Sequence, residues 1–148
     1  MRFDLPEGLK LVHEMRIPVR WGDLDAMGHV NNTIYFRYFE SLRIEWLQTF
    51  RAEPNPEGIG PVMANGFCNF IRQIEYPGEV IARHFVVPPK PGSKSLDTYF
   101  TLSVSDTPDV VSANGGATLV WLDFPNKKTV PLPDDLRAAC GVRPPAAC

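Results

Sequence analysis

One long helical segment, set in a chain that is otherwise rich in strand signals, constrains the fold more than any other feature of this sequence. From about Asn32 to Phe50, apolar side chains recur at three- and four-residue spacing, the period of a buried helix face. Further apolar residues widen this face to much of the helix circumference: Ile34, Phe36, Ile44 and Trp46. Such a helix is enclosed by other structure rather than laid on a surface. Asn31 or Asn32 can cap its start, because a short amide oxygen accepts a hydrogen bond from a first-turn N–H.

Strand patterns stand on both sides of this helix. Before it, apolar residues alternate with polar or small ones from Met15 to Trp21, and Pro18 indicates an edge strand or a strand with one free side, because proline cannot donate to a ladder. The predicted strands after it are 62–73, 79–87, 95–105 and 110–123, with a short extension near 129–131. Gly115 and Gly116 indicate a bulge or a close approach of another group to the backbone. One buried helix held by an antiparallel sheet belongs to the α+β class.

The composition bounds the class of protein. A chain of 148 residues is one domain's worth of sequence, and we expect a single domain over 1–148, with an irregular arm at 1–13 and a frayed tail at 141–148. A formal net charge of −2 supplies no basic stripe for nucleic acid, and no run approaches the ~20 apolar residues that a membrane span needs. The N-terminus lacks an apolar signal segment, and three cysteines without metal-ligand spacing indicate reduced thiols, so we expect a cytoplasmic protein.

The segment from Arg20 to Asn32 holds the residues best suited to chemistry. It places a carboxylate, an imidazole and two amides just before the helix N-terminus, where backbone N–H groups are unpaired and about half a positive charge accumulates. An N–H there can polarise a carbonyl and stabilise a developing oxyanion, while a nearby carboxylate attacks that carbonyl or activates water. The alternative is a polar loop in which Asp23 and Asp25 make turn hydrogen bonds and Asn32 caps the helix.

The same segment carries a resemblance to a known family. WGDLD at 21–25, GHVNN at 28–32, Tyr35, YFE at 38–40 and Arg43 together resemble the 4-hydroxybenzoyl-CoA thioesterase family of hotdog-fold acyl-CoA thioesterases. VWLD at 120–123 and KKTVPLP at 127–133 are similar to that family's last strand and tail. The resemblance implies a hotdog fold, with one long central helix wrapped by a curved antiparallel sheet of about five strands. It also implies a homodimer or homotetramer that hydrolyses an acyl-CoA thioester at a cleft between subunits.

The resemblance assigns roles to residues of the loop. Asp25 matches the family's catalytic aspartate, which acts as nucleophile or general base, and Asn32 matches the position whose backbone N–H faces the thioester carbonyl. Asp23 is expected to hold the turn. The spacing of Asp25, His29 and the asparagines also resembles plant acyl-carrier-protein thioesterases, in which the matching histidine is treated as catalytic, although Met27 replaces their asparagine. His29 therefore either helps to position Asp25 or fills the loop.

A second segment resembles the part of the family that contacts coenzyme A. Ser93, Lys94 and Ser95 open a strand where family members carry a similar turn against the pantetheine arm or the phosphates. Backbone N–H groups and a lysine suit that task, and a solvated turn is the alternative. Tyr35, one turn into the long helix, either lines the acyl pocket or belongs to the core.

Four further residues are weaker candidates. Arg72, Arg83 and His84 could reach the phosphates of coenzyme A, although isolated surface charges often contribute only to solubility. Cys68 lies in a predicted strand with no base paired with it in the sequence, so we expect a small core residue rather than a nucleophile.

The sequence therefore predicts an acyl-CoA thioesterase. The reaction requires no cofactor and no metal, because a thioester is already activated, the helix end supplies the electrophilic aid, and coenzyme A is part of the substrate. The alternatives are an acyl-carrier-protein thioesterase or a hydratase on the same fold, and a non-catalytic module that binds acyl-CoA. All of them leave the identity of the acyl group open.

Overall fold

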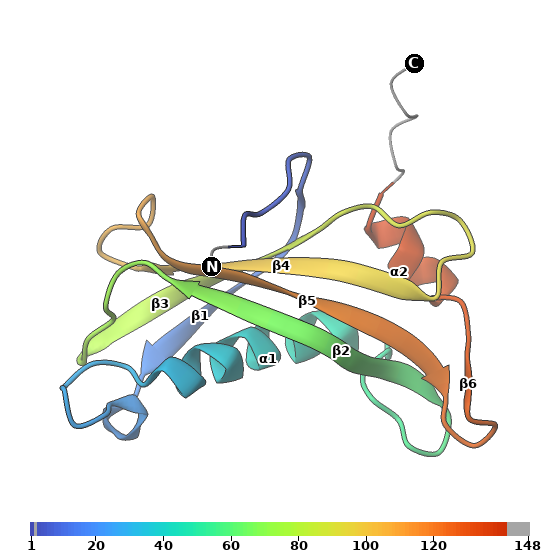
Figure 1. Ribbon diagram of the computed structural model, residues 1–148, viewed down its shortest axis with the longest axis horizontal. Coiled ribbons are helices and arrows are strands. Elements are labelled where there is room, and N and C mark those ends of the chain that lie inside the picture. The colour runs from blue at the N-terminus through green and yellow to red at the C-terminus, as the bar shows by residue number, and fades with distance from the viewer. Residues whose placement is uncertain (2, 142–148) are drawn as a thin grey trace.

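One antiparallel sheet curves around a single long helix (Figure 1). This computed structural model describes residues 1 and 3–141. In chain order, the elements are β1 (Lys10–Val19), the 3-10 turn η1 (Trp21–Asp23), α1 (Asn32–Gln48), β2 (Ile59–Phe70), β3 (Gly78–Val86), β4 (Ser95–Val104), β5 (Val111–Asp123), β6 (Lys128–Thr129) and α2 (Asp134–Ala139). The architecture is the α+β hotdog fold that the sequence predicted, with α1 inside the curve of the sheet.

The strand order puts β1 and β2 at the two edges of the sheet. The order is β1-β3-β4-β5-β2, every neighbouring pair is antiparallel, and β6 adds a short pairing to β5. Because α1 connects the two edge strands, it passes across the whole sheet. The edge position of β1 confirms the interpretation of Pro18, since a missing N–H would break the ladder of a central strand.

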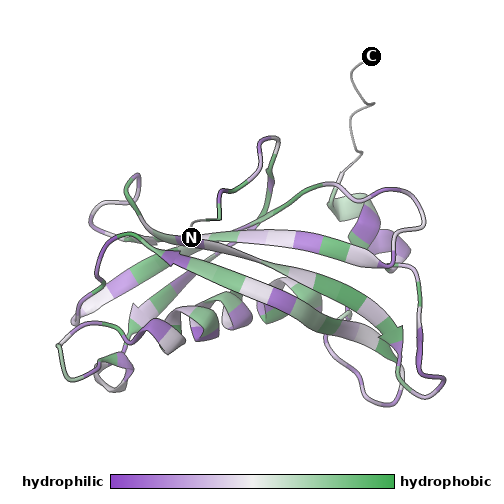
Figure 2. Cartoon of the chain, viewed as in Figure 1, coloured by the Kyte–Doolittle hydropathy of each residue, from purple (hydrophilic) through white to green (hydrophobic). Residues whose placement is uncertain are grey.

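Apolar and polar residues alternate along the strands, so that one face of the sheet is buried and the other is more exposed to solvent. Figure 2 shows hydrophobic and hydrophilic residues alternating along the strands. In β4, Leu96, Phe100 and Leu102 are at most 1% exposed, whereas Asp97 between them faces solvent. The predicted two-faced strand at 95–105 is confirmed, and its buried face lies against α1.

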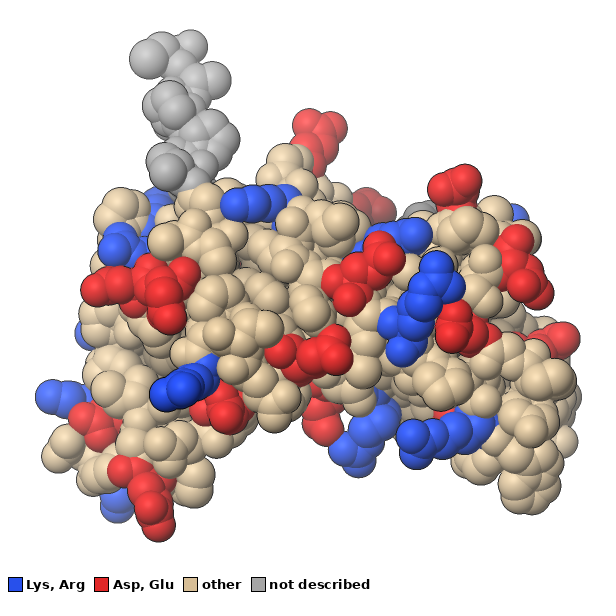
Figure 3. Space-filling model, turned by 180° about the vertical axis from the view of Figure 1, so that it is seen from behind, with Lys and Arg blue, Asp and Glu red and all other residues tan. Residues whose placement is uncertain are grey.

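Charged side chains of both signs are interspersed over the face seen in Figure 3. Across β1 and β3, Arg16 pairs with Glu79 at 2.9 Å and Arg83 pairs with Glu14 at 3.1 Å. No helix in the described part of the chain has the length and apolar character needed to cross a membrane.

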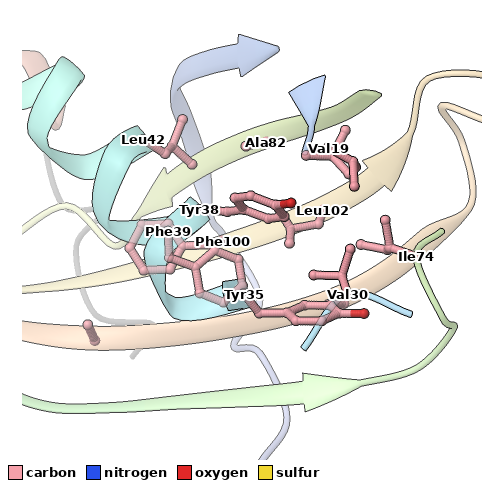
Figure 4. Packing of buried hydrophobic residues seen from close by; sticks show 13 residues of the cluster. Val19, Val30, Tyr35, Tyr38, Phe39, Leu42, Ile74, Ala82, Phe100 and Leu102 are labelled. Carbon is pink, nitrogen blue, oxygen red and sulfur yellow. The ribbon is translucent and has the colours of Figure 1, made fainter. Parts of the chain in front are cut away.

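The main core fills the space between α1 and the inner face of the sheet. Tyr38, Phe39 and Leu42 of α1 are buried in one cluster with Phe100 and Leu102 of β4 (Figure 4). Phe39 stacks on Phe100 with ring centroids 4.9 Å apart. Burying a large apolar side chain of this kind stabilises the fold by about 1.5–3 kcal/mol, so this cluster anchors the helix on the sheet.

Gly115 and Gly116 of β5 allow α1 and β2 to lie close to the β5 backbone. A Cβ at Gly115 would lie 3.0 Å from the ring of Phe39, and a Cβ at Gly116 would lie 2.9 Å from the rings of Phe67 and Tyr99. Larger residues would push these neighbours away. The predicted close approach is confirmed, and no register shift interrupts the pairing at these two positions.

Several boundaries differ from the predictions. β1 begins at Lys10, so the end of the expected arm at 1–13 pairs with β3 instead of being irregular. α1 ends at Gln48 rather than at Phe50, and β6 makes six strands in place of about five. The predicted strand at 62–73 starts earlier, at Ile59, and ends at Phe70. Beyond Phe70, the backbone N–H groups of residues 71 and 72 both donate to the carbonyl of residue 112. This shared acceptor ends the regular pairing of β2 with β5.

The helix α2 was not expected from the sequence. It has six residues, too few for a periodic apolar signal, and it is held by the buried Leu136 in a cluster with Trp121 and Leu132. The Lys10 ammonium group donates a hydrogen bond to the Ala139 carbonyl at 3.0 Å. It thereby provides a donor for one carbonyl group at the C-terminal end of the helix. Of the tail expected to fray, 142–148 lie outside the described residues.

Candidate active site

The Asp23 carboxylate holds the loop between β1 and α1. Its Oδ2 accepts hydrogen bonds from the Arg20 N–H at 2.9 Å and from the Tyr38 hydroxyl at 2.7 Å. The Asn31 N–H donates to the Asp23 carbonyl at 2.9 Å. Burial, reinforced by the Asp23 carboxylate, raises the pKa of the Tyr38 hydroxyl well above its usual value, so the hydroxyl stays protonated and remains a donor. Asp23 thus holds the turn, as the sequence predicted.

Asp25 lies on the same loop with one carboxylate oxygen engaged. Its Oδ1 accepts a hydrogen bond from the Met27 N–H at 2.8 Å, and its N–H donates to the His29 carbonyl at 2.9 Å. Gly28 closes this turn with a φ of 78°, a conformation that glycine adopts at little cost. No described residue donates to Oδ2 of Asp25. One oxygen is therefore held in place while the other is available for chemistry.

The start of α1 decides between the two candidate caps. Asn31 is the N-cap, and its Oδ1 accepts hydrogen bonds from the Thr33 N–H at 2.9 Å and the Thr33 hydroxyl at 2.8 Å. Asn32 is the first helical residue, so its N–H is among those without an intrahelical acceptor. No other described residue accepts a hydrogen bond from this N–H. The helix end therefore presents a free backbone donor at residue 32.

These groups line one pocket of about 310 Å³. One wall comes from the loop and α1 and includes Asp25, His29, Asn32 and Tyr35, four residues that the sequence selected. The opposite wall is 70–73, where the chain leaves β2. This second wall was missed apart from Arg72, because no local spacing in the sequence connects the end of β2 with the start of α1.

His29 sits at the rim of the pocket between two segments. Its Nε2 lies 3.6 Å from Oε1 of Glu75, and the two residues form an isolated antiparallel bridge. The Val30 N–H donates to the Ile74 carbonyl at 2.8 Å, which fastens the loop to the chain that follows β2. The imidazole thus has a carboxylate on one side and lines the pocket beside Asp25.

Tyr35 belongs to the pocket and to the core at once. Its side chain is buried within the main cluster, and the edge of its ring meets Phe70 with centroids 4.9 Å apart. Burial raises the pKa of its hydroxyl. The two alternatives posed by the sequence for Tyr35 are therefore compatible.

The candidate coenzyme A turn lies at the other end of the sheet. Ser93 and Ser95 line a separate pocket of about 190 Å³, and the Ser93 hydroxyl donates to the Ser95 carbonyl at 2.7 Å. The Lys94 carbonyl accepts from the Trp121 N–H. The nine residues of β3 separate this turn from the Asp25 pocket, a span of about 30 Å at ~3.3 Å per residue. Within one chain, the structure does not bring Ser93, Lys94 and Ser95 to the Asp25 pocket.

The weaker candidates occupy different settings. Arg72 lines the Asp25 pocket, whereas Arg83 is tied to Glu14 and to a carbonyl at residue 108. His84 is fully buried under α1, because its side chain points from β3 into the core. The prediction that it could reach the phosphates of coenzyme A is therefore wrong. Burial raises the pKa of the Cys68 thiol to about 12, which keeps it protonated and agrees with a packing role.

A family model described as the thioesterase-like superfamily matches residues 19–140. The chain belongs to this superfamily. The matched region begins at the end of β1, includes the loop with Asp25 and the whole of α1, and continues to α2. The resemblance drawn from WGDLD and GHVNN is thereby confirmed at the level of the superfamily.

Several individual proteins are similar to this chain in sequence or in structure. YsmA of Bacillus subtilis, an uncharacterized protein, is 31% identical over 85 residues, and the match spans 57% of this chain but only 56% of YsmA. The PA2801 protein of Pseudomonas aeruginosa, called a "putative Thioesterase", is 33% identical with a TM-score of 0.80 over 88% of this chain and 98% of its own. XC229 of Xanthomonas campestris, called a "putative acyl-CoA thioesterase", is 31% identical with a TM-score of 0.67 over 77% and 95% of the two chains. A DHNA-CoA thioesterase of Staphylococcus aureus shares the fold at 18% identity, with a TM-score of 0.73 over 86% and 87%.

Proposed function

We propose that this protein hydrolyses acyl-CoA thioesters in the pocket between the β1–α1 loop and the end of β2. One observation carries the proposal: a carboxylate with a free oxygen, Asp25, and an unpaired helix-end N–H, at Asn32, line the same pocket. Membership of the thioesterase-like superfamily and the names of two similar structures support the choice of a thioester over other carbonyl compounds.

The chemistry follows from these two groups. The thioester oxygen accepts a hydrogen bond from the Asn32 N–H, and the positive end of α1 stabilises the negative charge that develops on it. Asp25 then attacks the carbonyl carbon, the C–S bond breaks, and water hydrolyses the resulting mixed anhydride. In the alternative route, Asp25 removes a proton from the water that attacks. Both routes consume one water and release a free acid and coenzyme A, and neither requires a metal or a further cofactor.

The role of His29 follows from its place beside Asp25. We propose that the imidazole, with Glu75 on its other side, keeps Asp25 oriented toward the carbonyl. This is the positioning role that the sequence left as one of two alternatives.

The exposed edge of β2 supports a homo-oligomer as the active form. The edge has no neighbouring strand in the described chain, and Met63, Phe70 and Ile71 along or just beyond it are about half exposed. An unpaired strand edge with exposed apolar side chains pairs readily with another strand. We propose a homodimer, alone or as half of a tetramer, in which a second copy closes the pocket. Contact between coenzyme A and Ser93–Ser95 would then be made by the second copy.

Two free thiols, Cys68 and Cys140, support a reducing compartment, and we propose the cytoplasm as the site of the reaction.

A screen of short-chain, long-chain and aromatic acyl-CoAs, each compared with the same acyl group on acyl-carrier protein, tests the function. Release of free coenzyme A well above the uncatalysed rate is expected, and Asp25→Asn should remove most of it. Turnover only on acyl-carrier protein, or tight acyl-CoA binding without turnover, would contradict the proposal.

A further inference from the structure

Arg43, in the second half of α1, carries a partly buried charge. No described residue makes a hydrogen bond or a short ion pair with its guanidinium, although the Glu40 carboxylate is near enough to act on it electrostatically. Glu40 is already engaged, because its Oε1 accepts a hydrogen bond from Nη1 of Arg37 at 2.7 Å. Withdrawing a charge from water without a partner costs free energy, and the fork of an arginine holds five N–H donors. Arg43 therefore lacks an oxygen acceptor.

Arg43 faces a cavity of about 180 Å³ between α1 and the strands β2, β4 and β5. The rings of Phe36, Phe39 and Phe100 line it, and glycines of β2 and β5 leave its space unfilled. Most of the lining residues are apolar or glycine, and the polar residues Thr33, Arg37, Glu40 and Arg43 of α1 form one side. A cavity of this kind suits a ligand that is apolar along its length and carries an acceptor at one end.

A second polar side chain without a partner lies next to this cavity. His84 is 0% exposed, and neither of its ring nitrogens has a hydrogen-bond partner. Its ring stacks on Phe100, a lining residue, with centroids 4.7 Å apart, and it lies close enough to Arg43 to be affected by that charge. Two polar side chains for which the described residues provide no hydrogen-bond partner thus lie near this cavity.

The cavity lies on the same stripe of α1 as the proposed reacting end. Asn32, Phe36 and Arg43 stand at i, i+4 and i+11, which places them on one side of the helix. Eleven residues correspond to about 16 Å along the axis, and a long helical side chain leans back toward the N-terminus, which shortens the gap. An acyl group whose carbonyl sits at the Asn32 N–H would run over Phe36 and end near Arg43.

The charges along this stripe favour an anion. Arg37, Glu40 and Arg43 are two cations and one anion, so this side of the cavity carries one excess positive charge. We propose, on the basis of the function argued above, that the preferred acyl group carries an anionic oxygen at its far end and that Arg43 binds it. A terminal carboxylate and an ionised phenol share this chemistry, and both are tested below. Arg43 is then a specificity-determining residue of the thioesterase.

Matched substrate pairs test this assignment on the whole protein. Suberyl-CoA and octanoyl-CoA have equal carbon chains and differ only in the terminal carboxylate, while 4-hydroxybenzoyl-CoA and benzoyl-CoA differ only in the phenol. We expect kcat/KM to favour the member with the acceptor by about ten- to a hundred-fold in at least one pair, the range for a hydrogen bond to a charged group. The pair that shows the preference identifies the source of the anion.

The substitution Arg43→Met keeps an unbranched apolar stem like that of arginine and removes the charged guanidinium. It should erase the preference for the member with the acceptor, and Arg43→Lys should restore part of that preference. Arg16→Met is the matched control, because Arg16 is an exposed cation on the opposite edge of the sheet. Equal rates for both members of each pair in the wild type, or a preference that survives Arg43→Met, would overturn the inference.

Direct binding separates this inference from the proposed function. Calorimetric titration with suberate, compared with the uncharged octanamide, measures binding to the cavity without turnover. Tighter binding of suberate to the wild type and its loss in Arg43→Met support the site even if no thioester is hydrolysed, a result that would refute only the proposed function. Hydrolysis of octanoyl-CoA with no advantage for suberyl-CoA and no binding of suberate would refute the site alone.

Discussion

Replacing Asn32 by proline tests the electrophile at the start of α1 directly. Asn32 is the first residue of the helix, where the φ of proline fits and its missing N–H breaks no helical hydrogen bond. Proline also forces the preceding residue into an extended backbone, and Asn31 already has φ −59° and ψ 138°. The substitution therefore removes one N–H while the backbone that surrounds it can stay unchanged.

The expected effect on stability is small and the expected effect on turnover is large. Because Asn31 provides the cap, Asn32→Ala and Asn32→Pro should both leave the free energy of unfolding within about 1 kcal/mol of the wild type. Asn32→Ala keeps the N–H, so its kcat should change little. Asn32→Pro loses the donor to the oxyanion, and removal of one such donor lowers kcat by about 10²–10³. The contrast between the two variants isolates the backbone group from the side chain.

The assay is steady-state release of coenzyme A from the best acyl-CoA substrate, with free thiol as the readout. Circular dichroism and light scattering on both variants establish that helix content and oligomer mass are unchanged. If two well-folded variants show the same kcat, the N–H of residue 32 does not polarise the carbonyl. His29, which lines the same pocket, would then be the first donor to examine.

Three further outcomes are expected. Asp25→Asn should lower kcat by about 10²–10⁴ without unfolding the protein, and Asp23→Asn should lower it less while reducing the melting temperature; kcat and thermal melts of both variants check this. Asn31→Ala should lower the free energy of unfolding by about 0.5–2 kcal/mol through the lost cap, as measured by urea denaturation. Burial lowers the pKa of the His84 imidazole well below 6.5. As the pH falls, this imidazole therefore binds a proton in the unfolded chain before it does so in the folded protein. The free energy of unfolding should then decrease below about pH 6.5, by at most about 1.4 kcal/mol per pH unit. Urea denaturation of His84→Leu should therefore show a shallower acid dependence than the wild type, and parallel pH curves would contradict a buried neutral imidazole.

The fold was predictable because periodicity is a local property of the chain. The spacing from Asn32 to Phe50 is enough to place α1, and alternation with a proline is enough to place β1 at an edge. The choice between Asn31 and Asn32 as the cap was not predictable in this way. Both carry the same amide, and only the backbone geometry selects Asn31.

The candidate site was predictable only on the side of the β1–α1 loop. The wall from Phe70 to Gln73 depends on where β2 leaves the ladder, which is set by the carbonyl of Ser112 on the neighbouring strand. That is a contact between distant parts of the chain. For the same reason the sequence could not assign His84, because a strand with polar residues on both faces does not reveal which face the helix covers.

The hydrogen bond between the Tyr38 hydroxyl and Asp23 has a mechanical consequence. Tyr38 belongs to the second turn of α1 and is buried in the core. Its hydrogen bond to Asp23 therefore attaches the loop that carries Asp25 to the helix that presents the Asn32 N–H. The loop that carries Asp25 and the start of α1 are therefore joined by a contact that does not involve the substrate. The facing wall of the pocket ends at the edge of the sheet, where Phe70 and Ile71 are about half exposed and β2 has no second neighbour in the described chain. A second copy bound to that edge would therefore contact the wall at 70–73 and leave the hydrogen bond between Tyr38 and Asp23 in place.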